Sequence, residues 1–99
     1  MRRVTFVPVI RGFRHKGLAE LFRKGRSRRV GADLQNRALR RLDALERAAT
    51  PRDLNIPGFD FHPLSGKPQR YSVHVNGPWC ITFEWREGDA WHVDLEQYH

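Results

Sequence analysis

The last third of the chain alternates apolar and polar residues with the period of a β-strand. Segments 70–75, 79–85 and 90–95 carry large apolar residues at odd positions and mostly polar residues at even positions. Alternating segments separated by turn residues predict three antiparallel strands joined by tight turns. The odd positions must share one face to form a core, so odd residues should oppose odd residues across the sheet.

This parity predicts the register. A three-residue turn over 76–78 keeps odd residues opposed, whereas a two-residue Asn-Gly turn would break the pattern. Trp91 should then lie on the apolar face. The expected opposed pairs are Val75 with Trp79, Val73 with Ile81, and Phe83 with Val93.

The even positions gather polar and titratable side chains on the other face. The expected rows are His74, Cys80 and Glu96; Ser72, Thr82 and Asp94; and Glu84 with His92. Such a face is either exposed surface or a functional site. As a site, three chemistries compete: a thiol nucleophile at Cys80, a metal site, and metal-free RNA cleavage.

RNA cleavage fits best, because the sequence combines a basic surface with His62, Tyr98 and His99. A mid-strand cysteine is poorly placed as a nucleophile, and no Gly-rich turn would supply an oxyanion hole. The sequence has no closely spaced ligand pair of the kind found in structural zinc sites. Histidine and tyrosine can instead transfer protons while arginine or lysine stabilises charge, and no metal or cofactor is expected.

The first half of the chain predicts helices preceded by a short strand. We expect an edge strand over 9–13, a helix over 16–24 that stops at Gly25, and a second helix from an N-cap at Asp33 to about Thr50. A brief extended piece is expected within 59–64. One arc of the second helix is apolar, and it comprises Leu34, Ala38, Leu42, Leu45 and Ala49.

Basic and acidic residues are distributed unevenly between the two halves of the chain. Residues 1–52 hold fifteen of the eighteen Lys and Arg residues but only four of the eleven Asp and Glu residues. Such a basic half implies a polyanionic partner, most simply nucleic acid. Arg37, Arg40 and Arg47 form a separate helical arc, which is either solvated or attracts phosphate without sequence specificity.

Length and composition predict one domain over residues 1–99 in the cytoplasm. The chain has a single cysteine, which excludes an internal disulfide. Its apolar runs fall short of the roughly 20 residues that a membrane span needs, and its start does not resemble a signal peptide.

Several short motifs follow one another along the chain. They are Phe13-Arg14-His15-Lys16-Gly17-Leu18, Pro51-Arg52-Asp53-Leu54-Asn55-Ile56-Pro57-Gly58, His62-Pro63-Leu64-Ser65-Gly66, Val75-Asn76-Gly77-Pro78-Trp79 and Tyr98-His99. In this order and spacing they resemble the HigB-type toxins of the RelE/ParE superfamily. The resemblance runs from about Ile10 to the C-terminus, so residues 1–9 look like an N-terminal extension.

The resemblance implies a compact α+β domain in which an N-terminal strand and two helices pack on a small antiparallel sheet. It implies a toxin that cuts mRNA at the ribosome without metal. Its expected partners are a helix-turn-helix antitoxin like HigA and, through that complex, operator DNA. Carried over by motif, the catalytic residues are His62, Tyr98 and His99. The expected RNA-binding cations are Lys67, Arg70, Arg37 and Arg40.

Three positions depart from the family pattern. Cys80 stands where the family usually has arginine, Gln97 replaces the aspartate of Asp-Tyr-His, and Ser65 replaces a lysine. The alternative is therefore an attenuated toxin that acts mainly as antitoxin partner and operon co-repressor. The gyrase-directed branch of the superfamily is disfavoured by the closing Tyr-His. The remaining hypothesis is a basic RNA-binding module.

Overall fold

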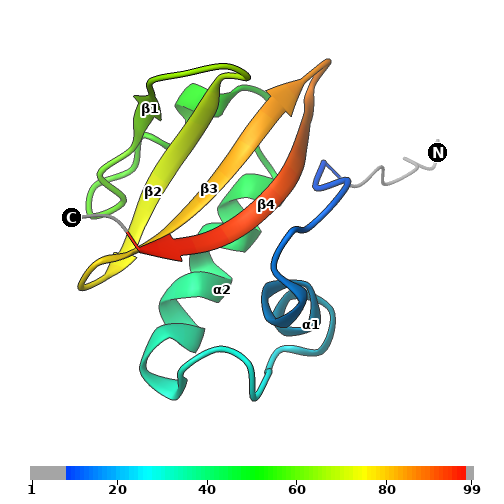
Figure 1. Ribbon diagram of the computed structural model, residues 1–99, viewed down its shortest axis with the longest axis vertical. Helices are drawn as coiled ribbons and strands as arrows, with labels where there is room; N and C mark the ends of the chain where they lie inside the picture. Colours follow the sequence, from blue (N-terminus) through cyan, green and yellow to red (C-terminus); the bar gives the residue numbers. More distant parts are fainter. Residues whose placement is uncertain (1–8, 98–99) are drawn as a thin grey trace, which may run out of the picture.

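The computed structural model describes residues 9–97 and places two helices against one face of a four-stranded antiparallel sheet (Figure 1). The strand order is β1-β2-β3-β4, so each strand neighbours the one that precedes it in sequence. This arrangement confirms the predicted α+β class. The elements are α1 (Lys16–Lys24), α2 (Ala32–Glu46), the 3-10 helix η1 (Pro51–Leu54), β1 (His62–Leu64), β2 (Arg70–Asn76), β3 (Trp79–Arg86) and β4 (Asp89–Gln97).

The register of β2 and β3 follows the predicted parity in the strand bodies. Val73 opposes Ile81, as expected. At the turn, however, Asn76 opposes Trp79, so the expected pairing of Val75 with Trp79 was wrong. A β-bulge at Val75 takes up the extra residue, which lets a two-residue turn close the hairpin while Val75 stays fully buried.

A second irregularity interrupts β4. The pairing with β3 is regular through Thr82 and Asp94, and then β4 carries one residue more than β3. His92 lies in this bulge with φ of +50°, a left-handed conformation that favours glycine. The direct opposition of Phe83 and Val93 is therefore lost, although both side chains remain fully buried.

The residues of β4 that precede the bulge point to the opposite face of the sheet from the one predicted. Glu84 opposes Trp91, and Ala90 rather than Trp91 enters the core. The prediction that Trp91 lies on the apolar face was wrong, because a one-residue shift turns every side chain to the other side of the sheet. On the polar face, the guanidinium of Arg86 lies 4.8 Å from the Trp91 ring centroid.

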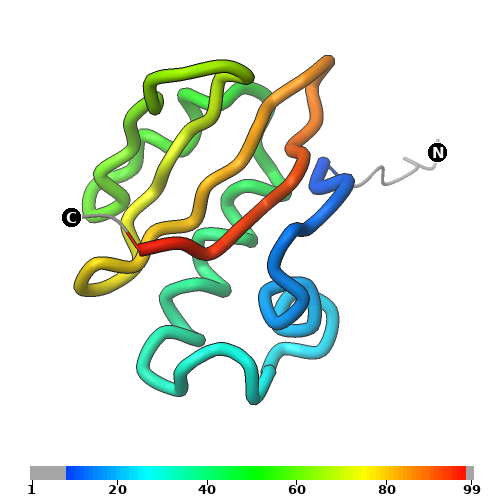
Figure 2. The backbone as a smooth tube through the Cα atoms, in the orientation of Figure 1, coloured from blue at the N-terminus to red at the C-terminus, as the bar shows by residue number. Residues whose placement is uncertain are grey.

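The segment before α1 runs beside β4 (Figure 2) but forms no regular strand. Ile10 and Phe13 each make an isolated parallel bridge, to Ala90 and Val93 respectively. The predicted strand over 9–13 was therefore wrong as a continuous element. Backbone hydrogen bonds join residues 9–14 to β4, and the carboxylate of Glu46 accepts the N–H groups of Val9 and Ile10. The segment thus covers the outer edge of β4.

Both helices form where the apolar pattern predicts them, with shifted ends on α2. In α1, His15 accepts the N–H of Leu18 at 3.0 Å, and Gly25 caps the C-terminus with φ of +82°. The N-cap of α2 is Gly31, so Asp33 lies in the first turn instead. Since α2 ends at Glu46, Ala49 is exposed, and its expected place in the core was wrong.

A buried arginine ties α2 to the loop before β1. Arg41 is only 6% exposed and donates to the carbonyl oxygens of His74 at 2.8 Å and Gly58 at 3.2 Å. Its guanidinium lies 4.3 Å from the Phe59 ring centroid. Burial lowers the pKa of Arg41, with the charges of Arg37 and Arg40 acting in the same direction. This contact helps to fix the loop that delivers β1 to the sheet edge.

Candidate functional site

The face of the sheet opposite the helices carries rows of polar side chains. One row crosses all four strands, because His62 opposes Ser72, Ser72 opposes Thr82, and Thr82 opposes Asp94. Directly opposed residues lie on the same face, so the four side chains share it. A second row is His74, Cys80 and Glu96, and a third is Leu64, Arg70, Glu84 and Trp91. We call this surface the polar face.

Arg70 spans the polar face from β2 to β4. Its guanidinium donates to the Thr82 hydroxyl at 2.8 Å, to the Glu84 carboxylate at 3.2 Å and to the His92 carbonyl at 3.0 Å. It also lies 3.9 Å from the Glu96 carboxylate. The Arg70 side chain is only 14% exposed. The guanidinium of Arg70, a predicted RNA-binding residue, thus makes its observed contacts within the protein.

Glu84 is the buried anion of this network. One carboxylate oxygen contacts Arg70, accepts from Nδ1 of His92 at 2.8 Å, and lies 3.9 Å from Arg14. The hydrogen bond from His92 lowers the pKa of Glu84, and the charges of His92, Arg70 and Arg86 lower it further against the opposing effect of burial. Glu84 therefore stays ionised while surrounded by cationic groups.

His62 lies at the open end of the first row. Its Nδ1 is 3.0 Å from the carbonyl oxygen of Asp60, and its side chain is exposed on the edge strand β1. A carbonyl oxygen can only accept, so Nδ1 carries the hydrogen and a neutral ring presents its lone pair at Nε2. Within residues 9–97, Nε2 has no hydrogen-bond partner. The ring is thus anchored on one side and open for proton transfer on the other.

The other predicted site residues are distributed unevenly. Lys67 and Arg70 line one hollow of about 330 Å³ beside β1. Arg37 and Arg40 are exposed on α2, on the other side of the sheet, so the structure does not bring them to His62. Tyr98 and His99 lie outside the described residues.

Comparison with known proteins gives the family. A model described as the RelE-like toxin of the type II toxin–antitoxin system HigB matches residues 11–99. The chain belongs to the HigB toxin family. Endoribonuclease HigB of Proteus vulgaris is 39% identical over 92 residues, which cover 92% of this chain and 100% of that protein. Toxin HigB-1 of Vibrio cholerae is 29% identical over 89 residues, which cover 87% of this chain and 94% of that protein.

Membership confirms the resemblance seen in the motifs. A toxin of a type II system has an antitoxin as its partner. No helix in the described part of this HigB-family toxin has the length and apolar character to cross a membrane.

The position that departs most from the family pattern lies in the second polar row. Cys80 is buried, 8% exposed, between His74 and Glu96. The ring of His74 contacts the Gly77 carbonyl at 2.9 Å, and among the described residues no hydrogen bond joins it to Cys80. The row therefore does not form a thiol–imidazole pair. Within residues 9–97, no group of three or more His, Cys, Asp or Glu side chains is arranged to hold a metal.

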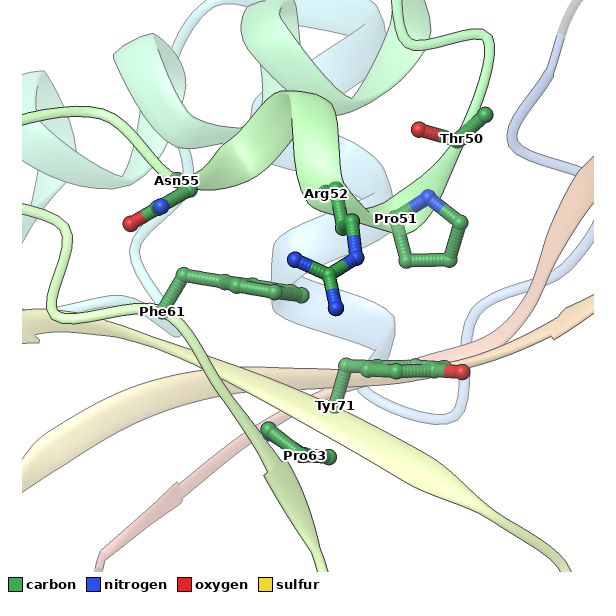
Figure 3. Close-up of a pocket in the computed structure, with 7 residues that line it drawn as sticks. All are labelled: Thr50, Pro51, Arg52, Asn55, Phe61, Pro63 and Tyr71. Carbon is green, nitrogen blue, oxygen red and sulfur yellow. The ribbon is translucent and has the colours of Figure 1, made fainter.

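A cleft on the other side of β1 was missed from the sequence. It has a volume of about 610 Å³ and opens between η1 and the first two strands (Figure 3). The alternation in Phe61-His62-Pro63 was the available signal, because it sends Phe61 and Pro63 to the side opposite His62. The lining residues are Thr50, Pro51, Arg52, Asn55, Phe61, Pro63 and Tyr71.

Proposed function

We propose that this toxin is an endoribonuclease that cleaves mRNA on the translating ribosome by metal-free acid–base chemistry. The observation that carries the proposal is His62, an exposed imidazole with Nδ1 anchored and Nε2 open at the end of the polar row. The name of the Proteus vulgaris relative, Endoribonuclease HigB, supports the activity.

The reaction uses the ribose next to the scissile phosphate. A general base removes the proton of the 2′-hydroxyl, the resulting oxygen attacks phosphorus, and a general acid protonates the leaving 5′-oxygen. His62, Tyr98 and His99 supply these proton transfers. The products are a 2′,3′-cyclic phosphate and a 5′-hydroxyl, with no redox change.

Cations beside the reacting phosphate stabilise its developing charge. Lys67 is exposed and lines one hollow next to β1 together with Arg70, which supports a role for both in binding substrate RNA. For Arg70 to contact phosphate it must share its donors with Glu84 and Thr82. Arg37 and Arg40 face solvent on the helix side, where they would contact the phosphates of a different RNA segment.

The proposal includes the biological context. The chain acts in the cytoplasm as one toxin domain over residues 1–99, with residues 1–9 as an extension. A family match that begins at residue 11 supports this boundary. Its antitoxin is a helix-turn-helix protein like HigA, and the complex of the two binds operator DNA.

A translation system reconstituted from purified components tests the activity. A defined mRNA is translated with the toxin, and new 5′ ends are mapped by primer extension. Cleavage is expected within codons on ribosomes, with little cleavage of the free mRNA. His62→Ala should lower the rate on the order of 10²–10⁴-fold, the usual contribution of general acid–base catalysis. Arg23→Ala, an exposed change on α1, is the matched control. Intact mRNA on wild-type toxin would overturn the proposal.

Buried Cys80 favours a second candidate, an attenuated toxin that acts mainly as antitoxin partner and co-repressor. Cys80 lies on the polar face where the family pattern has arginine, so a phosphate-binding cation is missing there. Cys80→Arg should then raise cleavage by on the order of a hundredfold, the typical value of one such contact. An unchanged rate in the Cys80→Arg toxin would count against attenuation.

A further inference from the structure

The cleft between η1 and the edge of the sheet combines flat aromatic surfaces with uncommitted polar groups. The rings of Phe61 and Tyr71 are nearly parallel, with centroids 5.8 Å apart and planes inclined by 10°. Figure 3 shows the Arg52 guanidinium projecting from η1 toward these two rings. Both rings are partly exposed and line the cleft, and Tyr71 also stacks on Phe83 at 5.7 Å on its core side.

The polar groups of the cleft are free to bind a ligand. Within residues 9–97, the side chains of Arg52 and Asn55 make no hydrogen bond or ion pair with the protein. Asp53, the acid between them in sequence, is occupied by the N–H groups of Ala49 and Thr50, and these bonds lower its pKa. Among residues 9–97, Arg52 is the one charged residue that lines the cleft.

We infer that this cleft binds one nucleobase of single-stranded RNA, with the base stacked between Arg52 and Tyr71. Proteins recognise unstacked bases by stacking them on aromatic rings and guanidinium planes. A cavity of about 610 Å³ has room for a base and its ribose. The choice of RNA as ligand rests on the proposed function and on the excess of cations in residues 1–52.

The path of the chain connects this cleft to the polar face. Phe61 and His62 are adjacent, and β1 is a three-residue strand at the outer edge of the sheet. An RNA strand that presents a phosphate to His62 needs only to cross this short edge for a neighbouring base to enter the cleft. The cleft would then hold a nucleotide that flanks the cleavage point, and it would contribute to the choice of sequence.

NMR titration of the full-length toxin tests the inference. The His62→Ala protein, which keeps the cleft intact and prevents turnover, is titrated with single-stranded rA4 and rU4. The largest amide shifts are expected at Arg52, Asn55, Phe61 and Tyr71. Arg52→Ala should weaken binding about tenfold, in line with the contribution of stacking to single-strand binding. Arg52→Lys should recover little of it, because lysine keeps the charge but has no planar group.

Controls separate the cleft from general charge attraction. Arg23→Ala removes an exposed arginine from α1 and should change affinity less than twofold. Equal weakening by Arg23→Ala and Arg52→Ala would overturn the inference, since binding would then follow net charge alone. Shifts at the cleft that grow with protein concentration in the absence of RNA would also overturn it, because the occupant would be a second copy of the chain.

The result is independent of the cleavage assay. If RNA binds in the cleft but translated mRNA stays intact, the proposed activity is wrong and the binding site is supported. If mRNA is cleaved on ribosomes but the cleft amides do not shift with RNA, the activity is supported and the binding site is wrong.

Discussion

The two faces of the sheet are equally buried at their centres, but different interactions stabilise them. On the helix side, Phe83 is fully buried, and Val73 and Ile81 are each 1% exposed. On the polar face, Thr82 is fully buried and Ser72 is 1% exposed. Apolar packing is non-directional, whereas the polar face depends on hydrogen bonds that Arg70 makes to specific oxygens.

This difference explains why the polar face is suited to hold the candidate catalytic residues in fixed positions. A buried polar network is favourable when every member is satisfied, and it then fixes the positions of its groups. Among the described residues, no buried side-chain nitrogen or oxygen lacks a partner. The network therefore fixes the positions of the side chains in the row that ends in His62.

The apolar face should show the largest effect of a single change. Phe83→Ala removes a fully buried ring that stacks on Tyr71 at 5.7 Å, and it should lower the free energy of unfolding by about 3–5 kcal/mol. Urea denaturation followed by tryptophan fluorescence measures this change. Ile56→Ala, at an exposed site, should stay within about 0.5 kcal/mol. A loss below 1 kcal/mol for Phe83→Ala would mean that the helices do not pack tightly on the sheet.

Breaking the polar network should rank next. Arg70→Met removes the ion pair between Arg70 and the Glu84 carboxylate and leaves the contacts of Glu84 with His92 and Arg14, and it should cost about 2–3 kcal/mol. Adding Glu84→Gln to Arg70→Met should restore part of that loss, because the buried charge is removed with its partner. Urea denaturation of the wild type, both single variants and the double variant gives a double-mutant cycle, which measures the coupling free energy between Arg70 and Glu84. Strictly additive losses would show that the two groups are not coupled.

A smaller effect is expected at the centre of the polar face. The Thr82 hydroxyl accepts from Arg70 and donates to Glu96. Thr82→Val keeps the branched shape and removes both bonds, and it should cost about 1 kcal/mol. Thermal unfolding measures the change, with exposed Ser65→Ala as control. If Thr82→Val stabilised the protein, packing rather than hydrogen bonding would dominate both faces.

The smallest effect should appear in the pH dependence of stability. The pKa of Glu84 lies below its ordinary value of 4.5 in the folded protein, so the unfolded chain binds the proton more readily. The resulting stabilisation is complete above the unfolded pKa and is lost as pH falls through the lower folded pKa. The Tm difference between wild type and Glu84→Gln should therefore shrink from pH 6 to pH 3. A constant difference would show that the Glu84 charge contributes nothing to the polar face.

Periodicity predicted the elements and most pairings, because each helix and strand buries one regular face. The predicted strand pairing was wrong where a β-bulge places one extra residue in a strand. The bulges at Val75 and His92 leave no mark in the alternation, and the second sent Trp91 to the face opposite the one predicted. A bulge is decided by the packing of the whole sheet, which local pattern does not contain.

The candidate site could be predicted only in part. The motif around His62 identified the residue, while its place at the end of a four-strand row depended on β1 pairing with β2. Arg41 was missed because a buried arginine looks like any other helix cation until its carbonyl partners are known. Arg70 was predicted to bind RNA, but its internal bonds join residues up to twenty-two positions apart.

Both margins of the sheet are closed to further strands in the described part of the chain. The outer margin of β1 is only three residues long and has Pro63 at its centre, which cannot donate to a ladder. The outer margin of β4 is already bonded to residues 9–14. Exposed margins invite strand addition and aggregation, and short, proline-bearing or covered ones prevent them. Addition of a further strand at either described margin is therefore disfavoured, which protects this toxin against cross-β assembly.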